Sequence, residues 1–498
     1  MTAAASASAP VPAEADTVTT AVPARLDRLP WSRWHWMIVI GLGTVWILDG
    51  LEVTIVGNVA GRIAEEGSGL DISSAQITGT AAALYVAGAC SGALFFGRLT
   101  DRYGRKKLFM VTLAVYLAAT AMTALSFETW WFFLFRFLTG FGIGGEYAAI
   151  NSAIDELIPS HYRGRVDLII NGSYWLGAIG GSLLSIVMLD TAIFPKDLGW
   201  RLSFALGVVL GLVILLVRRH VPESPRWQYI HGHGEEAEKL VGEVEKQIEQ
   251  EKGEPLPPPG AEITIHQRKS ISFVEIGRTV FAHYPRRAVL GLSLFIGQAF
   301  LYNAITFGFG AILITFYDVP TGSTGYYFAV IAAGNFLGPL VLGKLFDTVG
   351  RRIMISSTYI LSGLLLFVTA WLFDQEILTA TSLTACWCVV LFFASAGASS
   401  AYLTVSEIFP METRAMAIAF FYALGTAAGG ISGPLIFAKL TESGVVGDTV
   451  LAFQIGAGLM TAAGLVAAFL AVRAERQSLE DIARPLSEVG ERTSRQVA

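Results

Sequence analysis

Charged residues are scarce in this chain. Of its 498 residues only 15% are Asp, Glu, Lys or Arg, whereas ordinary soluble domains carry about 25%. Hydrophobic residues make up 53%, which excludes a disordered chain, a coiled coil and an ordinary soluble domain. The formal net charge is only −5, so the composition indicates no nucleic-acid partner.

Cysteines and catalytic motifs are also scarce. Cys90, Cys386 and Cys388 lie inside apolar stretches, so we expect neither a disulfide framework nor a metal site. Residues 338–344 resemble part of a phosphate-binding loop, but Leu345 stands where that loop needs Ser or Thr. Because no nucleophile accompanied by a base is found, we expect no enzyme and no bound cofactor.

Long apolar runs are what the chain has instead. Each is about 20 residues long, the length that crosses a bilayer as a helix. The predicted spans are 36–58, 76–97, 107–126, 130–152, 166–189, 200–217, 287–315, 325–343, 352–373, 379–403, 414–437 and 450–472. The sequence therefore predicts an all-α integral membrane protein with twelve transmembrane helices that contact the lipid bilayer.

Basic residues fall mainly on one side of these spans. If the N-terminus is inside the cell, the inner loops hold the basic clusters at 98–107, 163–165 and 344–352, and the outer loops hold few Lys or Arg. The positive-inside rule then predicts a multi-pass protein of the cell membrane with both termini in the cytoplasm.

The same pattern divides the chain into five parts. We expect a disordered cytoplasmic tail (1–35), a six-helix bundle (36–217), a cytoplasmic linker with surface helices (218–285), a second six-helix bundle (286–472) and a C-terminal tail (473–498). No secretory signal is expected, because the basic residues come late and the first apolar run is full length.

The chain also repeats itself. Gly-Arg-Leu-Thr-Asp-Arg-Tyr-Gly-Arg-Lys at 97–106 follows the second span, and Gly-Lys-Leu-Phe-Asp-Thr-Val-Gly-Arg-Arg at 343–352 follows the eighth. A Glu-x-x-Pro element with a later Arg follows the fourth and tenth spans, at 156–163 and 407–414. Two motifs recurring in the same order predict two pseudo-symmetric six-helix bundles, with a substrate site between them.

The repeated loop carries charges suited to a latch. Asp101 can cap a helix N-terminus or pair with Arg105, and Gly104 permits a tight turn. The alternative is that the basic residues only set the topology. The gate candidates from the two motifs are Asp101, Arg105, Glu156, Arg163, Asp347, Arg351, Glu407 and Arg414.

Three charged residues lie within the membrane spans at similar depth. Asp49 and Glu52 are three residues apart in the first span, and Arg136 lies early in the fourth. Such charges are costly in a bilayer and usually pair or face a cavity. They form either a structural ion pair or a proton-coupling pair, in which protonation of Glu52 loosens the pair so that the bundle can rock.

Polar and aromatic residues at cavity depth are the candidate substrate contacts, because amides and rings suit a polar organic solute. Each taken singly is equally compatible with helix–helix packing. They are Asn171, Tyr174, Trp175, Gln298, Tyr302, Asn303 and Asn335. Glu146 joins them as a residue that either faces the cavity or pairs near the inner gate.

These motifs together resemble the major facilitator superfamily over nearly the whole chain. Residues 97–107 match its signature loop, and Pro-Glu-Ser-Pro-Arg at 222–226 matches its sugar-porter-like branch. The glycines after Arg136 and the Ser-Glu-Ile-Phe-Pro at 406–410 match the fourth and tenth spans of that branch. The acidic pair of the first span is similar to that of synaptic-vesicle-protein-like and metabolite:proton symporter members.

The resemblance implies roles for several residues. It adds Glu223 and Arg226 to the gate, gives Glu52 the position of a proton-coupling Asp, and favours Asn171, Gln298 and Asn303 as substrate contacts. The sequence departs from sugar porters at Gly397, where they have a hexose-stacking Trp, and their C-terminal Pro-Glu-Thr-Lys element is reduced to residues 478–482. A hexose is therefore not the expected substrate.

The sequence thus predicts a monomeric secondary transporter. We expect it to move a small polar organic solute, such as a sugar, a polyol or an organic acid, by alternating access in symport with protons. Two alternatives stay open: a uniporter with a purely structural ion pair, and a non-transporting sensor or interaction protein built on the same scaffold.

Overall fold

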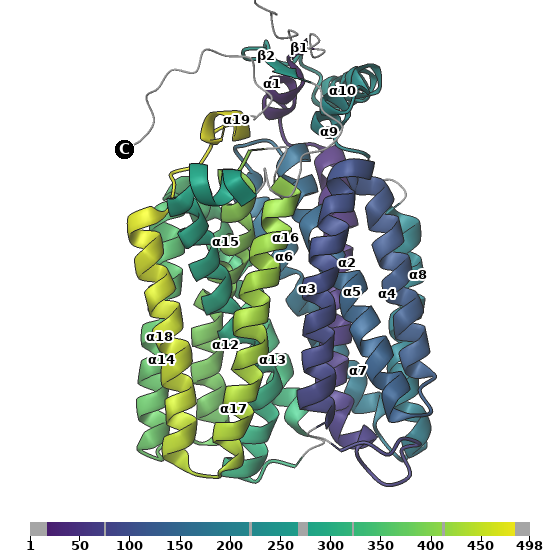
Figure 1. Cartoon of the computed structure of the whole chain (residues 1–498), viewed down its shortest axis with the longest axis vertical. Coiled ribbons are helices and arrows are strands. Elements are labelled where there is room, and N and C mark those ends of the chain that lie inside the picture. The colour runs from purple at the N-terminus through teal and green to yellow at the C-terminus, as the bar shows by residue number, and fades with distance from the viewer. Residues whose placement is uncertain are drawn as a thin grey trace, which may run out of the picture.

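The computed structural model describes residues 17–73, 76–218, 222–266, 277–320, 323–410 and 414–483. Its helices form two bundles that lie side by side, the first drawn in purple to blue and the second in green to yellow (Figure 1). This is the predicted all-α fold of two bundles, and the two are called here the first half and the second half.

The first half runs from α2 to α8. Its elements are α2 (Arg33–Ile63), the π-helical segment η1 (Gln76–Ala81), α3 (Ala82–Tyr103), α4 (Arg105–Ala124), α5 (Thr129–Leu157), α6 (Arg163–Gly172), α7 (Tyr174–Met188) and α8 (Lys196–Arg218). The predicted fifth span is thus divided at Ser173 into α6 and α7.

The second half runs from η2 to α18. Its elements are η2 (Thr279–His283), α12 (Pro285–Tyr317), α13 (Thr324–Thr348), α14 (Arg351–Asp374), α15 (Ala380–Ile408), α16 (Arg414–Gly425), η4 (Thr426–Ile431), α17 (Ser432–Glu442) and α18 (Val446–Leu470). The segments α16, η4 and α17 follow one another without a break and form the predicted eleventh span.

Membrane-length helices account for all the predicted spans. Within the described residues, ten helices are long and apolar enough to cross a membrane. The other two spans are α5, which carries Arg136 and Glu146 along its length, and the divided helix α6–α7. The predicted boundaries are short by several residues, because charged turns at the helix ends stay helical beyond the apolar core of each span.

Glycines allow the helices of the first half to approach closely. A Cβ atom on Gly144 of α5 would lie 1.9 Å from the carbonyl oxygen of Ala89 in α3. A Cβ atom on Gly50 of α2 would lie 1.8 Å from the carbonyl oxygen of Tyr174 in α7. Small residues at such crossings are the common means of packing helices in a bilayer.

The repeated loop motif forms the same turn in each half. Gly104, between α3 and α4, has φ of +95°, and Gly350, between α13 and α14, has φ of +111°. These are backbone conformations that favour glycine, so the predicted tight turn is confirmed in both halves.

A small cap covers one end of the bundles, called here the capped end; the opposite end is the far end (Figure 1). Its elements are α1 (Val22–Asp27), α9 (Pro225–Ile230), α10 (Gly234–Lys252) and the antiparallel strands β1 (Thr17–Thr20) and β2 (Ile263–His266), with α19 (Leu479–Ile482) beside them. The charged run at 235–252 is the predicted surface helix.

The N-terminal region differs from the predicted disordered tail. Residues 17–20 pair with β2, and 22–27 form α1, whose Val22 and Leu26 are buried. They pack in one apolar cluster with the buried face of α10, which includes Val241 and Val244. The tail prediction rested on the lack of apolar periodicity, and it missed a short helix that is folded by tertiary packing. Residues 1–16 lie outside the described part.

Candidate functional site

A cavity of about 170 Å³ lies between the two halves, near the middle of the spans. Its lining contains eight aromatic residues, three amides and several hydroxyls. The wall comprises Trp46, Val53, Tyr85, Val86, Ala89, Tyr147, Asn171, Tyr174, Trp175, Gln298, Ala299, Tyr302, Asn303, Thr306, Ser395, Ala398, Ser399, Tyr402, Tyr422 and Thr426. Small-molecule sites commonly combine apolar rings with a few polar groups in this way.

Six of the predicted substrate contacts line this cavity. Asn171, Tyr174 and Trp175 come from the α6–α7 helix of the first half, while Gln298, Tyr302 and Asn303 come from α12 of the second. The rings of Trp175 and Tyr302 meet at 5.5 Å. The structure therefore brings these two predicted groups together across the boundary between the halves.

Two predicted contacts lie behind the wall instead. Asn335 is fully buried in α13, where its Oδ1 accepts a hydrogen bond of 2.9 Å from the Tyr302 hydroxyl. Glu146 is also fully buried, with the Thr112 hydroxyl 3.4 Å from its Oε1. Neighbouring residues of a helix point about 100° apart, so Tyr147 faces the cavity and Glu146 faces the interior of the first half. Neither residue is part of the cavity wall, so the helix-packing alternative describes Asn335, and Glu146 does not face the cavity.

The sequence interpretation missed most of the aromatic wall. Trp46 and Tyr147 stack at 4.6 Å, nearly parallel, and Tyr422 meets the edge of Tyr147 at 4.9 Å. Tyr402 completes this group, 5.9 Å from Trp46. We call these four residues the aromatic floor. Their signal in the sequence was weak, because a lone aromatic residue in an apolar span is usually ordinary core.

The aromatic floor lies toward the capped end. Tyr402 precedes Glu407 by five residues of α15, about 7.5 Å along a helix, and Tyr147 precedes Glu156 by nine residues of α5, about 13 Å. Since Trp46 and Tyr147 come from the first half and the other two residues from the second, contact between the halves closes the cavity on this side.

Two further pockets lead from the cavity toward the far end. A pocket of about 60 Å³ shares Val53 and Thr306 with the cavity. It shares Asn58 and Thr324 with a polar pocket of about 260 Å³ that also contains Arg62. The cavity therefore continues into a chain of pockets on the side away from the aromatic floor.

The predicted intramembrane charges are buried inside the first half. Arg136 Nη1 of α5 donates to Glu52 Oε1 of α2 at 2.9 Å, and both side chains are almost fully buried. The Thr120 hydroxyl donates to the other Glu52 oxygen at 3.1 Å. Asp49 lies one helical turn before Glu52 and is fully buried. The structure confirms the predicted ion pair between Glu52 and Arg136.

A single ring separates this ion pair from the cavity. Arg136 lies over the face of Tyr85 at 4.8 Å, and Tyr85 is part of the cavity wall. Neither Glu52 nor Arg136 belongs to that wall. The contact between Arg136 and Tyr85 therefore links the ion pair to the cavity wall.

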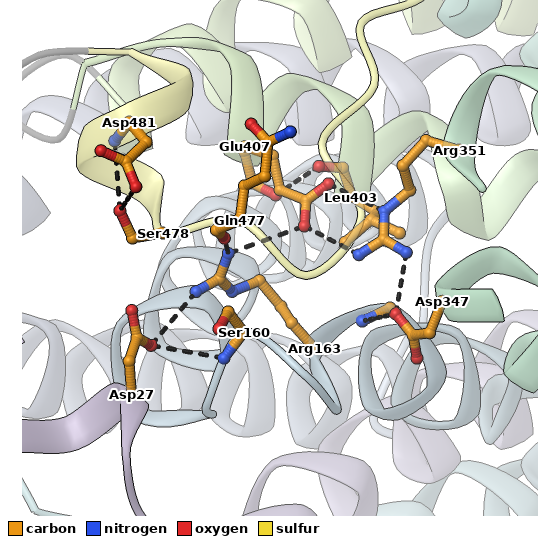
Figure 2. Close-up of polar contacts among 12 residues, drawn as sticks. Asp27, Ser160, Arg163, Asp347, Arg351, Leu403, Glu407, Gln477, Ser478 and Asp481 are labelled. Atoms are coloured by element: carbon orange, nitrogen blue, oxygen red, sulfur yellow. Dashed lines mark hydrogen bonds and ion pairs between the residues drawn. The ribbon is translucent and has the colours of Figure 1, made fainter. Parts of the chain in front are cut away.

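At the capped end, short ion pairs hold each half together. Arg105 Nη2 lies 2.8 Å from Glu156 Oε1 in the first half. In the second half, Arg351 binds Glu407 through two nitrogens at 2.9 and 3.0 Å and Asp347 at 2.8 Å (Figure 2). All of these side chains are nearly fully buried.

Other contacts of the same end join the two halves. Asp347 of α13 accepts hydrogen bonds from the backbone N–H groups of Gly164 and Arg165 at 3.2 and 2.8 Å, and so caps the N-terminus of α6. Arg163 lies 3.7 Å from Glu407, and Arg414 lies 3.9 Å from Glu156. We call these ion pairs and hydrogen bonds, together with the pairs within each half, the capped-end network.

Acidic residues outside the spans cap two further helices. Glu223 accepts from the backbone N–H groups of Arg105 and Lys106 at 2.8 and 3.1 Å, and Glu475 accepts from that of Arg351 at 3.3 Å. Glu475 thus occupies in the second half the place of Glu223 in the first.

Two further gate candidates have different outcomes. Arg226 of α9 is buried, and its guanidinium donates to the Glu156 carbonyl oxygen at 3.4 Å. Asp101 belongs to α3, but its side chain lies outside the described residues. Its counterpart Asp347 both caps a helix and pairs with Arg351, so the two alternatives proposed for this motif position occur together in the second half.

Within the described residues, no group of three or more His, Cys, Asp or Glu side chains has the arrangement of a metal site. The family model for sugar (and other) transporters matches residues 33–486. The chain belongs to this family. It is a membrane transporter of the major facilitator superfamily, with a small-molecule substrate, and not an enzyme.

Known relatives span most of this chain. The niacin transporter NiaP of Acinetobacter baylyi is 26% identical over 412 residues, covering 83% of this chain and 88% of its own. The inner membrane metabolite transport protein YdjE of Escherichia coli is 25% identical over 472 residues, covering 93% and 98%. The structure of the proton:xylose symporter XylE superposes with a TM-score of 0.73 at 18% identity, covering 90% of this chain and 98% of its own.

Proposed function

We propose that this transporter moves a small aromatic carboxylic acid across the cell membrane by alternating access, in symport with protons. The observation that carries this proposal is the aromatic cavity between the halves. It has a floor built by both halves on one side and a chain of pockets on the other. Rocking of the halves would open the floor and close the pockets, which is how such transporters expose a central site alternately.

The aromatic wall favours a flat ring as solute. Rings stack or meet edge to face with gains beyond those of buried area alone, and eight aromatic side chains surround this cavity. A carboxylate would be bound by amide and hydroxyl donors, since no Lys or Arg belongs to the described wall. The similarity to a niacin transporter supports an aromatic acid.

A sugar or polyol is the second candidate. Asn171, Gln298 and Asn303 present amides to the cavity, which suit hydroxyl groups. The structural likeness to a proton:xylose symporter also favours it.

Proton coupling is assigned to Glu52 and Arg136. A proton on Glu52 removes the negative charge that holds Arg136, so the bond between α2 and α5 weakens. Arg136 lies against Tyr85 of the wall, so this change would reach the solute site. With both termini in the cytoplasm, as the basic loops predict, the capped end faces inward and the proton gradient drives uptake.

Uptake by purified protein in liposomes tests the proposal. Labelled nicotinate, benzoate, xylose and inositol are offered with and without an inward proton gradient. We expect an aromatic acid to accumulate above its equilibrium level only with the gradient, and a proton ionophore to abolish this accumulation. Protein-free liposomes are the essential control, because weak acids cross bilayers unaided when protonated.

Other outcomes would contradict the proposal in distinct ways. Accumulation of xylose or inositol, without accumulation of an aromatic acid, would show that the solute is a sugar or polyol and not an aromatic acid. Equilibration of an aromatic acid that ignores the gradient would indicate a uniporter. Absence of uptake for every solute tried, with the protein folded, would favour the sensor alternative.

A further inference from the structure

The capped-end network has tight contacts within each half and looser ion pairs between the halves. Glu407 lies 2.9 Å from Arg351 in its own half but 3.7 Å from Arg163 across the boundary. Glu156 likewise lies 2.8 Å from Arg105 but 3.9 Å from Arg414. When this end opens, each of these carboxylates keeps a guanidinium of its own half.

Removing the ionic partner of a buried charge raises the free energy, because the charge then lacks compensation. Arg163 is fully buried and has contacts across the boundary, to the Glu407 carboxylate and to the Gln477 carbonyl oxygen at 3.4 Å. Opening of the capped end removes these contacts. A carboxylate that stays beside Arg163 in the open state would lower that cost.

Asp27, the last residue of α1, is such a carboxylate (Figure 2). Its Oδ1 lies 3.7 Å from Arg163 Nη2 and accepts a hydrogen bond from the Ser160 backbone N–H at 3.3 Å. Its Oδ2 lies 3.6 Å from Arg226 Nη2. Asp27 therefore faces two buried arginines, Arg163 of α6 and Arg226 of α9.

The N-terminal segment is attached to the first half, so Asp27 moves together with the first half. Arg25 Nη2 and Arg28 Nη2 each lie 2.6 Å from Glu245 of α10, and Arg25 also pairs with Glu238. The buried Val22 and Leu26 anchor α1 in the apolar cluster of the cap. Because α9 packs against α5 and α10, and Arg226 of α9 donates to the Glu156 carbonyl oxygen, α9 and α10 are attached to the first half.

We infer that Asp27 is a positioning residue of the gate. It holds Arg163 in both states and, by staying beside it when Glu407 moves away, lowers the free-energy cost of opening the capped end. This inference rests on the proposed alternating access. It gives the N-terminal segment, which lies outside both bundles, a defined part in transport.

Distance measurement between spin labels tests this without any solute. The three native cysteines are replaced by alanine, and labels are placed on cysteines at the exposed positions Lys107 of α4 and Thr348 of α13, at the capped end of each half. The ratio of long to short distances reports the open population. We expect Asp27→Asn to lower this ratio about threefold to tenfold, and Asp27→Glu to restore most of it.

Asp481→Asn is the matched control, since Asp481 is an exposed carboxylate in α19 bonded to Ser478. An effect of this control equal to that of Asp27→Asn would overturn the inference. So would an unchanged or higher open population in Asp27→Asn, which would make Asp27 a structural anchor or a lock. A single distance in the unmodified chain under all conditions would instead overturn alternating access itself.

Discussion

The two halves share one scaffold but differ in their interior charge. The first half buries Asp49, Glu52, Arg136 and Glu146 within its spans. The corresponding parts of the second half, residues 288–317, 324–343 and 380–406, contain no Asp, Glu, Lys or Arg. Their contribution to the cavity wall is amides, hydroxyls and aromatic rings.

This difference teaches how a duplicated bundle can divide its work. At the capped end both halves keep the same charged motifs, because each half must close against the other. In the membrane interior a buried charge is energetically costly, and in the spans compared only the first half carries such charges. On the proposed function, this difference assigns proton coupling to the first half, whereas both halves line the solute cavity.

Glu52→Gln is expected to have the largest effect, because it removes a buried charge that only the first half carries. The variant carries no titratable group at this position, so gradient-driven accumulation is lost while exchange of solute down its own gradient continues. Proteoliposomes loaded for uptake and for counterflow measure the two activities separately. Glu66→Gln, an exposed carboxylate three residues beyond the end of α2, serves as control. Accumulation that survives in Glu52→Gln would remove the pair from the coupling mechanism.

Gly164→Ala tests the closure that the halves share. A Cβ atom at this position would lie 2.4 Å from both Arg351 Nη1 and Asp347 Oδ1. We expect the capped end to be pushed open, with a severalfold loss of transport and a longer distance between labels on the two halves. Gly343→Ala is the matched control on the facing helix, because its Cβ would make only ordinary contacts, at 3.6 Å. Equal behaviour of the two variants would contradict the role of the α6 N-terminus.

Gln298→Leu addresses the second half alone. Loss of one amide from the cavity wall leaves solute polar groups without a partner, which typically costs about 1–3 kcal/mol and so weakens solute binding roughly tenfold to a hundredfold. The KM for uptake should rise while the dependence on the proton gradient stays unchanged. A variant that bound solute normally but lost coupling would overturn the division of work between the halves.

Glu245→Gln should have the smallest effect, confined to the cap of the first half. Burial acts to raise the pKa of Glu245, but hydrogen bonds from Arg25 and Arg28 outweigh it and hold this pKa below its usual value. A lowered folded-state pKa stabilises the cap above about pH 4.5, and this contribution is lost as pH falls through the folded-state pKa.

Hydrogen exchange of α1 measures this effect. In the unmodified chain, protection should hold from pH 7 to about pH 5 and fall below about pH 4.5. In Glu245→Gln, protection should be lower at pH 7 and show little further change. Identical profiles would mean that the apolar anchors Val22 and Leu26 alone hold the helix.

The sequence alone determined the twelve spans, the duplication, the glycine turns and the Glu52–Arg136 pair. These follow from hydropathy, from repeated spacing and from the cost of intramembrane charge, all of which act locally or through a few obligatory partners. The capped-end motifs could be recognised because they recur with the same spacing in both halves.

Only the tertiary structure decided which side chains face the cavity. One residue along a helix changes the direction of a side chain by about 100°, which separates Tyr147 on the wall from Glu146 behind it. The folding of the N-terminal segment was decided there too, because α1 is six residues long and so short a helix is stable only when its partners supply the packing. The position of a residue in its span fixes its depth in the membrane. The direction in which its side chain points, and the residues that it contacts, depend on how the helices pack against one another.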